Sequence, residues 1–128
     1  MNTQRNFEAE HKDNAGRKYA YDFDNVLRRY MMRTFGPEMV PGETLEMGCY
    51  KGEFTSLLVD AGAQLTVIEA AGDLVEEVSK RVGPKVTFIH STFERAQLSK
   101  RFDNIFLMHT LEHLDDPVGV LRLVNDWL

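Results

Sequence analysis

The sequence predicts an α/β protein in which a Rossmann-like open parallel sheet has helices on both faces. Three observations favour this fold class. Short apolar segments, typical of strands, alternate with longer segments whose apolar residues recur at helical spacing. Glycines and prolines mark the turns between the two kinds of segment. The segment Leu-Thr-Val-Ile-Glu at residues 65–69 is apolar and β-branched, as expected of a strand that is buried on both faces.

Length, charge and composition limit the classes of protein to which the chain could belong. Its 128 residues form one domain at most, and 43% apolar residues suffice for a core. The formal charge of −5 argues against a nucleic-acid binder, because phosphate contacts need clustered Lys and Arg. No apolar run approaches the ~20 residues of a membrane span, and the polar N-terminus does not resemble a signal peptide. Since Cys49 is the single cysteine, no internal disulfide can form, and we expect a soluble cytoplasmic protein.

The N-terminal part of the chain divides into a polar arm and a helix. Residues 1–18 are polar, and we expect them to form a flexible or lid-like arm. From Tyr21, apolar residues recur at helical spacing until Gly36-Pro37, where the helix should end. These residues are Phe23, Val26, Leu27, Tyr30, Met31 and Phe35. Tyr19 and Tyr21 either pack against the protein or fold over a ligand.

Two strand–helix pairs follow. Residues 44–47 are predicted to form a short buried strand that runs into a glycine turn at 48–52. The helix after this turn should present Phe54, Leu57, Leu58 and Ala61 on one face, with Gly62 at its C-terminal cap. The strand at 65–69 precedes a helix with Asp73 as its N-cap and Gly83-Pro84 at its end. The apolar residues of that second helix are Leu74, Val75, Val78 and Val82.

Two further strands and a helix complete the pattern. The strands are predicted at residues 85–90 and 102–108. The last helix should begin with Asp116 as its N-cap and Pro117 at its first position. Its expected apolar face comprises Val118, Leu121, Val124 and Leu128. Because crossovers between parallel strands are right-handed, the loops that follow the strands lie along one edge of the sheet, where ligands of such sheets bind.

Two acidic residues follow the first two strands on either side of the glycine turn. A carboxylate at Glu69 can accept hydrogen bonds from both hydroxyls of a ribose, although a solvated glutamate at a strand end is the simpler alternative. Gly48 permits a sharp turn and a close ligand, and Gly52 permits tight packing. Glu46 would repel a pyrophosphate, and Tyr50 stands where the dinucleotide-binding pattern has a glycine. A nucleoside with a positive charge, such as S-adenosylmethionine, fits these residues better than a nicotinamide cofactor does.

At these residues the sequence resembles the class I S-adenosylmethionine-dependent methyltransferases. L-E-M-G-C-Y-K-G-E-F-T is similar to their first motif, E/D-x-G-x-x-x-G, and V-I-E-A is similar to the second. S-T-F-E-R-A and the later R-F-D-N-I-F-L-M-H-T-L-E-H-L-D-D-P-V-G-V-L-R are similar to the third and fourth. The ending L-E-H-x-x-D-P resembles the small-molecule branch that contains the ubiquinone-biosynthesis O-methyltransferases. The resemblance implies the N-terminal half of a seven-stranded methyltransferase fold, with residues 19–128 as the S-adenosylmethionine-binding domain.

The resemblance also implies a set of cofactor-binding residues. Glu46 would bind the methionine ammonium through water, and the backbone of Gly48 and Cys49 would line the methionyl part. Glu69 would hold the ribose hydroxyls. The remaining implied residues are Gly52 in the glycine turn, Ala70, Thr92 and Phe93 around the adenine, and Met108 beside the sulfonium. Many relatives have an Asp where Thr92 stands, so the adenine contact should differ here. S-adenosylhomocysteine would be the product.

His109 and His113 are the candidate catalytic residues. The resemblance places His109 beside the acceptor, where a histidine could remove a proton from a hydroxyl group. Positioning alone can supply much of the rate, so a base is not required. The alternatives are a solvated His109 and a His113 bonded to the backbone in a helical turn. H-T-L-E-H also matches the zinc-peptidase pattern H-x-x-E-H, but His109 should end a strand, and downstream ligands are scarce because only fifteen residues follow His113, so we expect no metal.

Relatives continue beyond the last helix with three more strands. We therefore expect a fragment of a longer enzyme, which alone binds the cofactor weakly and transfers methyl groups poorly or not at all. An exposed edge on the fourth strand could pair with another chain, so self-association is possible. The acceptor should be a small molecule. The alternative functions, in order, are a non-catalytic S-adenosylmethionine-binding or scaffold protein, a nicotinamide-dependent oxidoreductase and a zinc hydrolase.

Overall fold

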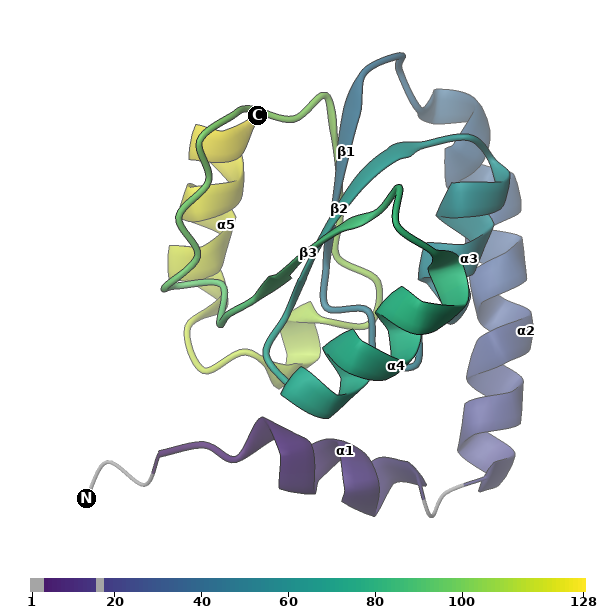
Figure 1. The fold of residues 1–128 in the computed structure, drawn as a ribbon, viewed down its shortest axis with the longest axis vertical. Helices are drawn as coiled ribbons and strands as arrows, with labels where there is room; N and C mark the ends of the chain where they lie inside the picture. Colours follow the sequence, from purple (N-terminus) through teal and green to yellow (C-terminus); the bar gives the residue numbers. More distant parts are fainter. Residues whose placement is uncertain (1–3, 16–17) are drawn as a thin grey trace.

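The structure is a computed structural model that describes residues 4–15 and 18–128 (Figure 1). Within these ranges, the side chains of residues 13–15, 18–22 and 24 are not described. The predictions for the side chains of Tyr19 and Tyr21, and for residues 1–3 and 16–17 of the N-terminal arm, therefore lie outside the described residues.

Four parallel strands form one sheet in the order β3-β2-β1-β4. The strands are β1 (Glu43–Met47), β2 (Gln64–Glu69), β3 (Thr87–His90) and β4 (Asn104–Phe106). The helices α3 (Glu53–Asp60) and α4 (Gly72–Val82) connect β1 to β2 and β2 to β3. The predicted fold class, an open parallel sheet with helices on both faces, is confirmed (Figure 1).

Alternating side chains of the central strands enter two apolar cores, one on each face of the sheet. On one face, Val67 of β2 packs with Leu58 of α3. On the other, Leu45 of β1 packs with Val120 of α5 (Pro117–Trp127). These four side chains are fully buried, and burying each contributes roughly 1.5–3 kcal/mol. Helix α2 (Lys18–Phe35) lies beside α3 on the first face (Figure 1).

The last two strands are shorter than predicted. Pairing of β4 with β1 runs from Asn104 to Phe106, whereas the apolar run predicts a strand over residues 102–108. The ladder ends because β1 turns away at Gly48, which leaves Met108 without a strand neighbour. At the other end, the Phe102 N–H donates to the carbonyl of Trp127 in α5, at 2.7 Å, and not to a strand.

One of the two predicted N-caps is confirmed. The Asp116 side chain accepts a hydrogen bond from Gly119 N at 2.9 Å, with Pro117 at the first position of α5. The prediction for Asp73 was wrong, because α4 begins at Gly72, two residues earlier than predicted, and Ala71 is its N-cap. Asp73 lies in the first turn, where its negative charge is still favourable for the helix.

The predicted apolar faces of α5 and α2 were wrong in part. In α5, Val120 is fully buried and Val124 and Trp127 pack beside it, whereas Val118 and Leu121 are exposed. In α2, Met31 packs against the core, but other predicted face residues are exposed. They are Phe23, Val26, Tyr30 and Phe35. Apolar spacing identified both helices but not the angle at which each meets the sheet.

The segment for which the sequence predicts a flexible or lid-like arm contains a helix, α1 (Phe7–Ala15). Figure 1 shows α1 lying beyond the end of the sheet at which α4 begins. In the described ranges, no helix combines the length and the apolar character that crossing a bilayer requires.

Candidate functional site

Gly48 forms the turn at the end of β1 and brings three loops together. Its φ of 84° lies in the left-handed region, which favours glycine. A Cβ at this position would lie 3.2 Å from Thr110 Oγ1 and 3.6 Å from Phe93 Cζ. Phe93 follows β3 and Thr110 follows β4, so the carboxyl ends of three strands surround a cradle that a side chain would fill. The Thr110 hydroxyl fixes this arrangement by donating to the Met47 carbonyl at 2.9 Å.

Gly52 closes the glycine turn against α4. It has a φ of 77° and is the N-cap of α3. A Cβ at Gly52 would lie 2.6 Å from Val78 Cγ1, a distance that real Cβ atoms do not reach. The absence of a side chain therefore allows α3 and α4 to pack closely, as the sequence predicts.

The Glu69 carboxylate holds the backbone of the glycine turn in place. One oxygen, Oε2, accepts hydrogen bonds from the backbone N–H of Cys49 at 3.1 Å and of Tyr50 at 3.3 Å. The other, Oε1, accepts from Ala71 N at 2.9 Å. Because an ionised carboxylate has about four acceptor positions, Glu69 retains capacity to accept further hydrogen bonds. Tyr50 has a φ of 48°, so the turn keeps a conformation that is uncommon for a non-glycine residue.

Glu46 lies on the same face of the sheet as Glu69 but deeper. Its side chain is 1% exposed and accepts a hydrogen bond from Thr55 Oγ1 at 2.6 Å. Burial, the largest cause, raises the pKa of Glu46 to about 8, together with the nearby charge of Glu69 and against the lowering effects of Thr55 and Arg28. The two carboxylates are therefore close enough to interact, and in the absence of a cation Glu46 is mostly protonated at neutral pH.

The loop after β4 places His109 and Met108 at the same edge of the sheet. His109 has a φ of 53°, and its side chain is 28% exposed. Its Nδ1 lies 3.7 Å from Glu112 Oε1, while its Nε2 is buried without a hydrogen-bond partner among the described residues. Strained backbone and a buried unpartnered nitrogen are features that cluster at functional sites. Met108 is half-buried against the α3 side of the core.

Comparison with known proteins identifies the family. Residues 19–128 match a family described as "Methyltransferase domain". The chain belongs to the class I S-adenosylmethionine-dependent methyltransferases. Among curated relatives, it is similar to the ubiquinone biosynthesis O-methyltransferases of Rickettsia felis, at 31% identity over 65% of the chain, and of Proteus mirabilis, at 29% over 77%. The chain spans 36% and 42% of the lengths of these two relatives.

Solved methyltransferase structures have the same fold. The glycopeptide N-methyltransferase MtfA, complexed with S-adenosylmethionine, aligns with a TM-score of 0.71 at 24% identity, over 77% of this chain and 45% of its own. The N-methyltransferase NodS from Bradyrhizobium japonicum aligns with a TM-score of 0.69 at 18% identity, over 84% of this chain and 63% of its own. At these identities the similarity supports the fold alone.

Sequence reasoning missed two buried residues of this methyltransferase domain. Thr55 bonds to Glu46 from α3, and the charge of Arg28, on α2, acts on the same carboxylate. Arg28 is 7% exposed. An arginine among the apolar positions of a helix was the available signal, because such a residue is rarely buried without an ionic partner.

The other predicted site residues lie around this edge with less distinct contacts. Cys49 is buried, and burial raises the pKa of its thiol well above the usual value, so it is a poor nucleophile. Ala70 and Thr92 are half-exposed in the loops after β2 and β3. His113 is exposed and ends a short 3-10 helix, Leu111–His113, so it does not share a helical face with His109.

In the parts of the chain that the structure describes, no three His, Cys, Asp or Glu residues group in a way that could hold a metal ion.

Proposed function

We propose that this chain is the cofactor-binding part of an enzyme that transfers a methyl group from S-adenosylmethionine to a small-molecule acceptor. The observation that carries the proposal is the glycine turn, held by Glu69 and without a side chain at Gly48, beside a second carboxylate at Glu46. The cofactor supplies an activated methyl group on a sulfonium. The protein must hold the cofactor, orient it and exclude water.

The residues present fit this cofactor. Glu69 already accepts three backbone hydrogen bonds, so about one of its four acceptor positions is left. Through this position it would accept a hydrogen bond from a ribose hydroxyl while it continues to hold the turn. Because Gly48 has no side chain, the methionyl part would lie close to the backbone of Gly48 and Cys49, with Met108 at the sulfonium side. The remaining implied contacts involve Gly52, which keeps α3 and α4 close, and Ala70, Thr92 and Phe93 around the adenine.

Glu46 would respond to the charge of the ligand. An ammonium bound through water favours the ionised carboxylate, and so opposes the burial that raises the pKa of Glu46 to about 8. Binding at neutral pH should then release a proton from Glu46. Isothermal titration calorimetry in buffers of different ionisation enthalpy measures this release directly.

His109 is our candidate for the residue that faces the acceptor. Its Nε2 has no hydrogen-bond partner among the described residues, so this nitrogen could accept a proton or a hydrogen bond from an acceptor hydroxyl. His113 is exposed and further along the loop, and we assign it a secondary role at the mouth of the site.

Calorimetry with S-adenosylhomocysteine and with NAD tests the cofactor proposal. We expect the first to bind and the second not to bind. Glu69→Ala should weaken S-adenosylhomocysteine binding by ~1–3 kcal/mol, the range for hydrogen bonds to a charged group. Glu43→Ala, at the opposite end of the sheet, is the matched control and should leave the affinity unchanged. Equal affinity of the Glu69→Ala variant would refute the ribose assignment, and NAD binding would refute the cofactor.

The acceptor, the partners and the compartment are part of the same proposal. Methyl transfer would distinguish an enzyme from a non-catalytic S-adenosylmethionine-binding protein, for which binding persists without turnover. Because the 128 residues span only 36% and 42% of the lengths of the two relatives, we expect them to transfer methyl groups poorly by themselves. We also propose that the exposed β4 edge of the sheet can pair with a second copy of the chain, and sedimentation velocity would detect this dimer. We further propose that the protein is cytoplasmic.

A further inference from the structure

The loop after β4 folds Glu112 back toward His109. The Thr110 hydroxyl donates to the Met47 carbonyl at 2.9 Å, and Thr110 is the N-cap of the short 3-10 helix that contains Glu112. The His113 N–H donates to the Thr110 carbonyl at 3.1 Å and closes this turn. Glu112 therefore lies on a turn that is anchored to the end of β1. Its Oε1 is 3.7 Å from His109 Nδ1.

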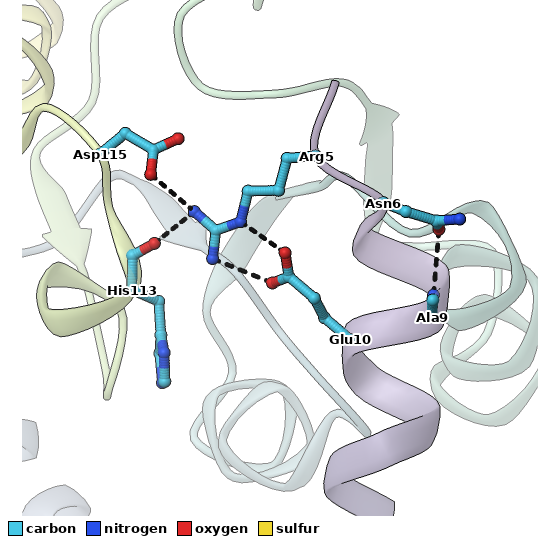
Figure 2. A network of polar contacts seen from close by, with 6 residues as sticks. All are labelled: Arg5, Asn6, Ala9, Glu10, His113 and Asp115. Atoms are coloured by element: carbon cyan, nitrogen blue, oxygen red, sulfur yellow. Dashed lines mark hydrogen bonds and ion pairs between the residues drawn. The ribbon is translucent and has the colours of Figure 1, made fainter. Parts of the chain in front are cut away.

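Contacts of Arg5 hold the far end of the same turn. Arg5 donates a hydrogen bond to the His113 carbonyl, and its Nη1 lies 3.7 Å from Asp115 Oδ1 (Figure 2). The two carboxylate oxygens of Glu10 accept from Nε and Nη2 of Arg5, at 2.7 and 2.9 Å, and so fix the direction of the guanidinium. Figure 2 also shows the His113 ring pointing away from Arg5. The turn is thus held at both ends, with Glu112 between them.

The two ring nitrogens of His109 have different surroundings. Nδ1 faces the Glu112 carboxylate, whereas Nε2 is buried and has no hydrogen-bond partner among the described residues. An ionised carboxylate only accepts hydrogen bonds, so it favours a proton on Nδ1 and leaves the free lone pair of the neutral ring on Nε2. The 3.7 Å separation exceeds a hydrogen bond, but catalytic hydrogen bonds are often long without a ligand and shorten in the complex. The buried nitrogen is then the one that can accept a proton.

We propose that Glu112 is a positioning residue, which holds His109 in the tautomer whose Nε2 accepts a proton from the methyl acceptor. The proposal rests on the proposed function, in which His109 faces a hydroxyl group of the acceptor. As the oxygen of that group forms its bond to the methyl carbon, its proton moves to Nε2, and the sulfur keeps the electron pair of the bond that breaks. The His109 ring is then positively charged, and the negative charge of Glu112 stabilises it. Glu112 acts through His109 and stays ionised throughout.

The tautomer of His109 tests this role. Long-range ¹H–¹⁵N correlation spectra of the ¹⁵N-histidine-labelled chain at pH 8 show which ring nitrogen has the proton, and His109→Asn assigns the signals. We expect mainly the tautomer with the proton on Nδ1. Glu112→Gln keeps the size of the side chain but removes its charge, so the ratio of the Nδ1–H to the Nε2–H tautomer should fall about two- to fivefold, as for a partly exposed ion pair. Glu112→Asp keeps the charge, and its ratio should lie between those of the wild type and Glu112→Gln.

Asp115→Asn is the matched control, because it removes one negative charge from the same loop, on a side chain that lies beside Arg5 (Figure 2). Its tautomer ratio should equal that of the wild type. A wild-type His109 with its proton on Nε2, or an equal ratio in the wild type and Glu112→Gln, would overturn the role of Glu112.

S-adenosylhomocysteine binding separates this proposal from the proposed function. The wild type and the three variants at Glu112 and Asp115 should bind it with equal affinity, because Glu112 acts on the acceptor side of the site. A loss of affinity in Glu112→Gln but not in Asp115→Asn would overturn the positioning role, since it would place Glu112 at the cofactor. Absence of binding to the wild-type chain would instead refute the proposed function itself.

Discussion

The two sides of the candidate site are built in different ways. At the ends of β1 and β2, buried carboxylates and backbone amides fix the glycine turn, and Glu46 and Glu69 are 1% and 9% exposed. In the loop after β4, Thr110 is buried but residues 111–113 are exposed. His109 has a left-handed backbone, and its Nε2 lacks a partner among the described residues. The first side is fixed by packing before a ligand arrives, whereas the second keeps polar groups available. This difference suits a methyltransferase in which the rigid side holds the cofactor and the loop after β4 selects the acceptor.

The largest expected effect concerns the buried carboxylate of the rigid side. Folding raises the pKa of Glu46 from 4.5 to about 8, so the folded state binds this proton more tightly than the unfolded state does. The resulting stabilisation is complete below pH 4.5 and is lost as the pH rises through 8. Glu46→Gln removes this dependence and should be more stable than wild type at pH 9, by roughly 5 kcal/mol, because the pKa rises from 4.5 to about 8 and one pKa unit corresponds to about 1.4 kcal/mol.

Urea unfolding at pH 4.5 and pH 9 measures this effect. At pH 4.5 the variant and the wild type should have similar free energies of unfolding, because both side chains are uncharged. Glu38→Gln, an exposed position, is the control and should follow the wild type at both values. If Glu46→Gln loses as much stability as the wild type between the two pH values, Glu46 is not the buried acid described here.

The next largest effect tests how tightly the rigid side is packed. Gly52→Ala places a Cβ 2.6 Å from Val78 Cγ1 at a φ of 77°, so it introduces both a clash and backbone strain. We expect a loss of about 3 kcal/mol in the free energy of unfolding. Gly62→Ala is a matched control, because Gly62 has a φ of 80° but no atom within 4 Å, so only the strain of about 1 kcal/mol remains. If both variants lose the same free energy of unfolding, the packing of α3 against α4 does not depend on the close contact at Gly52.

The rigid side was also the more predictable side. The sequence predicts that Glu46, Gly48, Gly52 and Glu69 lie at the ends of neighbouring strands, because strand ends and glycine spacing are local signals, and the structure confirms these positions. Thr55 could not, since its role depends on how α3 lies over β1. The inward face of α5 was misassigned for the same reason, because spacing does not fix the rotation of a helix about its axis. Helix α1 has weak amphipathic character, so its place beside the site is set by tertiary charge contacts that are not visible in the sequence.

The smallest effect is expected on the open side, at His109. Its φ of 53° is tolerated by Asn but not by a β-branched residue. We therefore expect His109→Asn to change the free energy of unfolding by less than ~0.5 kcal/mol and His109→Val to lower it by about 1–2 kcal/mol. Neither variant should alter S-adenosylhomocysteine affinity more than about twofold, because we propose that the cofactor binds mainly at the ends of β1 and β2. A large affinity loss in His109→Asn would show that the two sides of the site are not independent, and that the loop after β4 also positions the cofactor.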